Sequence, residues 1–218
     1  MNWTYLRNFL FLDTRFKFIG SLPKSGKLLD IGSSDGQTLN HFYEARPDLK
    51  LYATDIEGKP EAYPIGTNFF RGNIITDKLP WKDQSFDGIT CMHLVEHLEN
   101  CDNLLLEANR LLKNGASIYI ETPHPKTTEL SKSNAAKSVQ FTYNFWDDPT
   151  HVKVVYLEKL ELSASSLGFT VEKMGVSRNL FFAALYPFSF LLGARKRMIC
   201  KVHFIGWSVY IKFRKNAA

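Results

Sequence analysis

Short apolar segments alternate with helical segments through most of this chain. Strands are expected at 27–31, 49–54, 67–71, 85–92 and 116–121. Helices are expected at 36–45, 101–112 and 157–167. Alternation of this kind predicts a doubly wound α/β fold, in which parallel strands are joined by right-handed crossovers. Ligands bind such a sheet at the carboxyl ends of its strands, so functional residues should directly follow the strands.

The turn after the first expected strand is the most informative part of the sequence. Gly32 and Gly36 allow positive φ angles and let a ligand approach the main chain, and the amides of the next helix point toward that ligand. A dinucleotide site would favour G-x-G-x-x-G, but Ser34 and Gln37 replace its second and third glycines. Asp30 suits a cationic amino group better than a pyrophosphate. The turn therefore favours S-adenosylmethionine over a nicotinamide cofactor.

Polar residues also follow the second and third expected strands. Asp55 ends the second strand, where an acid can accept hydrogen bonds from both ribose hydroxyls of a nucleoside. Asn73 follows the third strand, and its amide oxygen can accept a hydrogen bond. The fourth strand begins with Ser85-Phe86-Asp87 and leads into Glu96-His97-Leu98.

This ordered series resembles the class I S-adenosylmethionine-dependent methyltransferases over residues 25–176. Their first motif is an acid, any residue, Gly, any residue, Gly or a small residue, any residue, and Gly. Asp30, Gly32, Ser34 and Gly36 fill those places. The resemblance implies a Rossmann-like methyltransferase fold with a mostly parallel seven-stranded sheet and an antiparallel last strand. Its last two strands are expected at 169–176 and 201–214.

The resemblance also implies S-adenosyl-L-methionine as cofactor and S-adenosyl-L-homocysteine as product. Asp30 would help hold the amino-acid end, Asp55 the ribose and Ile56 the adenine, while Asn73 stands where the family usually has an acid. The implied cofactor-binding residues are Asp30, Gly32, Ser33, Ser34, Gly36, Asp55, Ile56, Asn73, Ile74, Met92, His93 and Leu94.

The length of 218 residues fits a single domain, 1–218. We expect three parts within it. The first is an N-terminal helical segment, 1–24, with a helix over 3–19. The second is a cofactor-binding half, 25–122. The third, 123–218, holds a polar loop or lid with one short helix at 122–150, the acceptor side and the C-terminal strands.

Methyl transfer to a hydroxyl needs a base, and histidine titrates in the useful range. The candidate catalytic residues are His151, in the expected lid, and His93 and His97, which follow the fourth strand. His124 and Glu121 are further candidates on the acceptor side. No metal is expected, although Asp147 and Asp148 beside His151 leave a metal-dependent mechanism as a minor alternative.

The favoured acceptor is a hydroxyl on a small molecule or a glycan, and an amine or a carboxylate is a less favoured acceptor group. The net charge of +5 motivates nucleic acid as an alternative, but an Asn/Asp-Pro-Pro-Tyr type motif for base methylation is missing. A cofactor-binding subunit without catalysis is a third alternative, and the oligomeric state stays open. In 180–201 an apolar, aromatic stretch precedes Arg195-Lys196-Arg197, a pattern that suits a membrane surface or a lipid-linked acceptor. A cover over the acceptor pocket or a dimer contact would explain the same pattern.

The cysteines and the apolar segments bear on location. Cys91, Cys101 and Cys200 match no zinc spacing, which fits reduced thiols in the cytoplasm. The aromatic N-terminus does not read as a signal peptide. The longest apolar stretch, 180–193, contains Pro187 and is too short to span a bilayer. We expect a cytoplasmic protein, with contact to the inner face of a membrane as an open alternative.

Overall fold

The computed structural model describes residues 10–132 and 143–217. Within these ranges seven strands form one sheet in the order β3-β2-β1-β4-β5-β7-β6. The strands are β1 (Lys27–Ile31), β2 (Lys50–Asp55), β3 (Asn68–Arg71), β4 (Phe86–Met92), β5 (Leu112–Pro123), β6 (Phe169–Ser177) and β7 (Ser208–Lys215). The first five pair in parallel, whereas β7 is antiparallel to both β5 and β6. The predicted fold is confirmed, including its antiparallel last strand.

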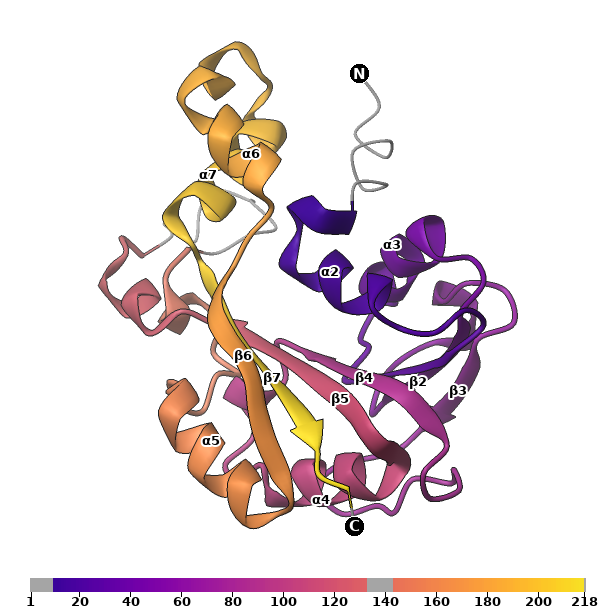
Figure 1. Cartoon of the computed structure of the whole chain (residues 1–218). Helices are drawn as coiled ribbons and strands as arrows, with labels where there is room; N and C mark the ends of the chain where they lie inside the picture. Colours follow the sequence, from indigo (N-terminus) through magenta and orange to yellow (C-terminus); the bar gives the residue numbers. More distant parts are fainter. Residues whose placement is uncertain (1–9, 133–142, 218) are drawn as a thin grey trace.

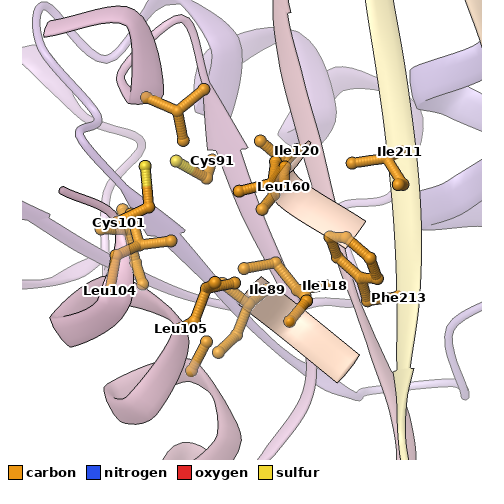
Figure 2. Packing of buried hydrophobic residues seen from close by; sticks show 14 of the residues in the cluster. Ile89, Cys91, Cys101, Leu104, Leu105, Ile118, Ile120, Leu160, Ile211 and Phe213 are labelled. Atoms are coloured by element: carbon orange, nitrogen blue, oxygen red, sulfur yellow. The ribbon is translucent and has the colours of Figure 1, made fainter. Parts of the chain in front are cut away.

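Helices cover both faces of this sheet (Figure 1). They are α2 (Thr14–Gly20), α3 (Gln37–Ala45), α4 (Asp102–Leu111), α5 (Leu157–Ser166), α6 (Leu180–Leu185) and α7 (Ala194–Ile205). Short 3-10 turns are η1 (Leu10–Leu12), η2 (Pro60–Ala62), η3 (Val95–His97), η4 (Pro125–Glu129), η5 (Phe145–Asp147) and η6 (Tyr186–Leu191). Neighbouring residues of β1 point to opposite faces of the sheet. Leu28 packs on the face covered by α2 and α3, and Leu29 packs on the face covered by α4 and α5. Figure 2 shows the second face, where Ile89 and Ile118 of adjacent strands meet Leu105 of α4.

The N-terminal helical segment is shorter than expected where the structure describes it. A helix was expected over 3–19, of which 3–9 lie outside the described residues. The remainder divides into η1 and α2 at Asp13, whose side chain caps α2 by accepting a hydrogen bond from the Arg15 amide at 2.9 Å. Phe16, Phe18 and Ile19 of α2 are buried against the sheet.

Two expectations for the second half need correction. The strand expected at 201–214 begins only at Ser208, because α7 continues to Ile205 and ends at Gly206 in the left-handed region (φ 69°). The loop expected at 122–150 contains two short 3-10 turns, η4 and η5, in its described part, and 133–142 lie outside the described residues. Local alternation of apolar and polar residues does not separate the end of α7 from the start of β7.

The segment from α6 to α7 joins the carboxyl end of β6 to the start of β7 and projects away from the sheet (Figure 1). It therefore stands above the edge at which ligands bind to sheets of this type. Among the described helices, none is long and apolar enough to cross a membrane.

Candidate cofactor and acceptor site

The turn between β1 and α3 is held to β2 by backbone hydrogen bonds. The amides of Gly32 and Ser33 both donate to the Thr54 carbonyl, at 2.9 and 3.2 Å. Gly32 has a φ of 76°, and a Cβ there would come within 2.9 Å of the Leu94 side chain. Glycine is therefore required both by the backbone and by the close approach of Leu94, which follows β4.

Asp55 connects this turn to the end of β2. One carboxylate oxygen accepts from the Ser34 amide at 2.8 Å, and the other accepts from the amides of Glu57 and Gly58 at 2.8 and 3.1 Å. A carboxylate offers about four acceptor sites, so backbone donors already use most of them. The two ribose contacts expected of Asp55 would require it to release at least one of these amides.

Asp30 lies in β1 with only 1% of its surface exposed. The Thr90 hydroxyl donates to its carboxyl group at 2.6 Å. Burial raises the pKa of Asp30, the Thr90 hydrogen bond lowers it, and the net pKa is about 7. A carboxyl group in this condition gains its full charge when a cation binds beside it, as the amino group of a ligand would.

The other residues expected to bind the cofactor differ in their surroundings. Ile56 is 60% exposed beside Asp55, whereas Ile74 is buried in the core on the α4 face. The side-chain oxygen of Asn73 accepts from the Ile75 amide at 2.9 Å, which leaves one acceptor site. Met92 is buried at the end of β4. The structure thus brings most of the expected set to one edge of the sheet, with the Ile74 side chain turned into the core.

His93 follows β4 and lies between two buried carboxylates. Its Nδ1 is 3.2 Å from Glu96 Oε1, and its Nε2 is 3.5 Å from Glu121 Oε1. Burial lowers the pKa of His93, but the hydrogen bonds and charges of Glu121 and Glu96 raise it, to a net value of about 10. His93 is therefore an imidazolium at neutral pH that donates to both carboxylates, and this state does not favour it as a base.

Glu121 joins His93 to the N-terminal helical segment. Its second oxygen accepts hydrogen bonds from Tyr119 at 2.9 Å and from Ser177 at 2.5 Å. Burial raises the pKa of Glu121, but His93 and the positive charge of Arg15 lower it to about 2. Arg15 is itself paired with Asp13 at 3.0 Å. A connected set of charged groups thus lines the carboxyl ends of β4 and β5.

His97 and His151 lie together beside this charged set. Their rings are 4.8 Å apart between centroids. His97 Nδ1 is 3.1 Å from the Thr150 carbonyl oxygen, and His151 Nδ1 is 2.6 Å from the Phe145 carbonyl oxygen. A carbonyl can only accept, and the Thr150 hydroxyl, 3.0 Å from His97 Nδ1, donates its own proton to Asp148. Each Nδ1 therefore carries a proton, and in the neutral ring Nε2 holds the lone pair. Either Nε2 is suited to accept a proton.

His124 has a local contact instead. Its Nδ1 accepts a hydrogen bond from the Lys126 amide at 3.0 Å, at the start of η4. Burial lowers the pKa of His124, and the charge of Lys126 lowers it further. The side chain of this histidine therefore caps a turn, while its backbone amide donates to the Trp207 carbonyl at 2.7 Å.

Sequence reasoning assigned no role to Glu96 or Arg15. Glu96 is fully buried, and the spacing of His93, Glu96 and His97 along the chain was visible as a His-x-x-Glu-His pattern. A carboxylate flanked by histidines in that pattern could have indicated a polar cluster. No local signal connects Arg15 with Glu121, since the two lie on elements far apart in sequence.

A family model described as a methyltransferase domain matches residues 3–174. The chain belongs to this family. It is a class I S-adenosylmethionine-dependent methyltransferase, an enzyme with S-adenosylmethionine as its cofactor. In this methyltransferase the turn between β1 and α3, the charged groups around Glu121 and the paired histidines lie at one edge of the sheet. No curated protein matches the chain.

Solved methyltransferase structures share the fold at low sequence identity. An S-adenosylmethionine-dependent methyltransferase from Archaeoglobus fulgidus is 22% identical with a TM-score of 0.61, over 91% of this chain and 90% of that one. A chain in the complex between the Haloferax volcanii Trm112 methyltransferase activator and a putative methyltransferase is 14% identical with a TM-score of 0.64. The match covers 99% of this chain and 96% of that one. Phosphoethanolamine N-methyltransferase 2 of Haemonchus contortus, solved with S-adenosyl-L-methionine, is 14% identical with a TM-score of 0.62. The match covers 98% of this chain and 53% of that one. At these identities the likeness shows the fold.

Proposed function

We propose that this methyltransferase is an O-methyltransferase that acts on a hydroxyl of a small molecule or of a glycan or lipid-linked acceptor. The observation that carries the proposal is the pair His97 and His151, whose Nδ1 protons are committed to backbone carbonyls. Their Nε2 atoms are therefore available to take the proton of an acceptor hydroxyl. Between them, His151 is the favoured base, because its side chain is only 8% exposed and packs against Phe145.

The cofactor is proposed to lie across the turn between β1 and α3. Asp30 would face its amino group, Asp55 its ribose and Ile56 its adenine, while Met92 and Leu94 would line the pocket beside the methyl group. In-line transfer forms the bond from acceptor oxygen to methyl carbon as the carbon–sulfur bond breaks, and its electron pair remains on sulfur. The hydroxyl proton passes to the base, so the enzyme supplies alignment and proton removal.

The projecting segment from α6 to α7 supports a lipid-linked acceptor. Phe188, Phe190 and Leu191 of η6 are 64%, 66% and 79% exposed, and Arg195 and Arg197 on α7 are exposed beside them. Apolar side chains next to basic ones suit the surface of an anionic membrane. This segment stands above the edge that holds the site (Figure 1). We propose that the enzyme works at the cytoplasmic face of such a membrane.

The first test is calorimetric titration of S-adenosylhomocysteine into the full chain and into Asp55→Ala. We expect the variant to lose roughly 1–3 kcal/mol of binding, the cost of unmade hydrogen bonds to a charged group. Asp102→Ala, an exposed acid at the start of α4, is the matched control and should bind as the wild type does. Equal binding by Asp55→Ala would remove Asp55 from the cofactor site.

The second test measures S-adenosylhomocysteine formation over a panel of acceptors. Hydroxyl-bearing sugars, lipid-linked glycans and phenols are expected to react, and His151→Gln should abolish most of that turnover while retaining cofactor binding. Turnover restricted to amines would contradict the O-methyltransferase proposal. Turnover restricted to RNA or DNA, with strong salt dependence, would favour nucleic-acid methylation instead.

A further inference from the structure

We propose that Glu96, His97 and His151 form a binding site for a divalent transition-metal ion. One ligand atom from each of these side chains lies within 4.8 Å of the other two. The site rests on the same residues as the proposed function and changes how they act there. With an ion bound, both Nε2 lone pairs would hold the metal, and the ion instead of His151 would promote loss of the acceptor hydroxyl proton to solvent. It departs from the expectation from sequence that the chain holds no metal.

The hydrogen bonds of the histidines determine which of their nitrogen atoms can bind an ion. The Nδ1 protons point to the carbonyl oxygens of Thr150 and Phe145, as metal-binding imidazoles usually donate their second nitrogen to a carbonyl or carboxylate. Nε2 of each ring is then the nitrogen left to bind an ion near the buried carboxylate of Glu96.

Backbone contacts fix the two segments that carry these side chains. The amide of Val152, next to His151, donates to the Glu96 carbonyl at 2.9 Å, so the loop is held directly on η3. The His151 ring also packs on Phe145, with 4.3 Å between ring centroids. The three side chains are thus held near one another before any ion binds, which reduces the entropy cost of binding.

The surrounding charge favours a cation. The carboxylate of Asp148 lies 3.8 Å from His151 Nε2 and is available as a fourth ligand. Glu96 accepts from His93 at 3.2 Å and from Thr122 at 3.1 Å, and a carboxylate with about four acceptor sites can still bind a metal. The positive charge of His93 is offset by Glu121 on its other side.

Two imidazoles and one carboxylate suit Zn²⁺, Fe²⁺, Co²⁺ or Mn²⁺ better than Mg²⁺, which favours oxygen ligands. Bonds of about 2.1 Å place neighbouring ligand atoms about 3–3.5 Å apart, so the side chains need to draw together by about 1 Å. Three protein ligands leave open positions on the ion. Thr150, whose carbonyl contacts His97, is exposed, so the oxygen atoms of an acceptor could approach those positions from solvent.

The test uses Co²⁺ as a spectroscopic probe on the chelator-treated full chain. We expect one Co²⁺ per chain, with visible absorption that differs from that of aqueous Co²⁺. His97→Gln and His151→Gln should each weaken binding by about 100-fold or more, since even residues behind metal ligands are worth about 10–100-fold. His124→Gln, a histidine that caps η4, is the matched control and should leave the titration unchanged.

S-adenosylhomocysteine binding by the same variants separates a lost site from a lost fold. Retained binding shows that the chain is folded and leaves the Co²⁺ result to decide. The metal proposal is overturned if the wild type gives only the aqueous Co²⁺ spectrum, or if both histidine variants bind Co²⁺ as the wild type does. If the wild type binds Co²⁺ but methylates no hydroxyl acceptor, the proposed function fails while the metal site stands.

Discussion

The proposed cofactor turn, between β1 and α3, and the proposed acceptor side, at the ends of β4 and β5, are built in different ways. The turn after β1 is held mainly by backbone groups: the amides of Gly32 and Ser33 bond to one carbonyl of β2, and Asp55 accepts from three backbone amides. The Tyr63 hydroxyl is a side-chain contribution from outside the turn, bonding to Ser33 and Ser34. The acceptor side is made by side chains from distant parts of the chain, as when Glu121 meets His93 and Ser177. A site formed by backbone groups depends on few side-chain identities. A site formed by side chains can be changed by substitution, and thereby accept a different acceptor, while the fold is kept.

The largest expected effect is on the acceptor side, in Glu121→Gln. The change keeps the shape of a residue that is only 3% exposed but removes the charge that faces His93 and Arg15. Breaking a buried ion pair by removing one partner costs about 3 kcal/mol or more, because the other charge loses its compensation. Urea unfolding at pH 7 measures this loss. Glu158→Gln, an exposed acid on α5, should change stability by no more than about 0.5 kcal/mol.

Gly32→Ala tests the cofactor turn by comparison with Gly115→Ala. Both glycines have a φ of 76°, but a Cβ at Gly115 meets nothing within 4 Å, whereas at Gly32 it meets Leu94 at 2.9 Å. Backbone strain costs each variant about 1 kcal/mol. The clash should add about 1 kcal/mol to the loss of stability in Gly32→Ala, and calorimetry should show weaker S-adenosylhomocysteine binding in that variant alone. If Gly32→Ala and Gly115→Ala have equal effects on stability and on binding, the Leu94 side chain moves aside without a measurable loss of free energy.

The same contrast explains what the sequence could predict. The sequence predicted the turn at Gly32, the acid at Asp55 and the order of the strands, because glycine and strand-end signals act over a few residues. The electrostatic effect of Arg15 on Glu121 could not be predicted, since only the folded sheet brings these elements together. The raised pKa of His93 likewise depends on Glu121 in another strand. The misplaced start of β7 followed from a helix and a strand with similar local patterns.

Asp30→Asn should raise stability while it weakens the cofactor site. The folded-state pKa of Asp30 is about 7, above its usual value of 3.8, so the folded state binds the extra proton. The stability that protonated Asp30 contributes to the folded state is therefore greatest below about pH 4, and it is lost as the pH rises to about 7. At pH 8 the variant should be more stable by about 1–2 kcal/mol, and near pH 4 the two proteins should be alike.

Asp30→Asn should have the opposite effect on cofactor binding, which we expect to become weaker. Removal of the Asp30 charge should weaken S-adenosylmethionine, whose amino group is cationic, by about 1.5 kcal/mol in calorimetry at pH 8. A variant that is more stable and binds as tightly as the wild type would show that Asp30 does not face the amino group. Thr90→Val, which removes the hydroxyl that donates to Asp30, provides a second way to change the same carboxyl group.

The smallest expected effect concerns the outer end of the acceptor side. Phe188→Ser with Phe190→Ser removes two exposed aromatic rings from η6 and should reduce binding to vesicles that contain anionic lipid by about 10-fold, or about 1.4 kcal/mol. Co-sedimentation measures the partition, and neutral vesicles should bind less because Arg195 and Arg197 lose their counter-charges. Ile65→Ser removes an apolar side chain that is fully exposed outside the projecting segment, and it should leave the partition unchanged. If the double variant and Ile65→Ser bind alike, the aromatic residues of η6 serve another contact, such as one with a second protein chain.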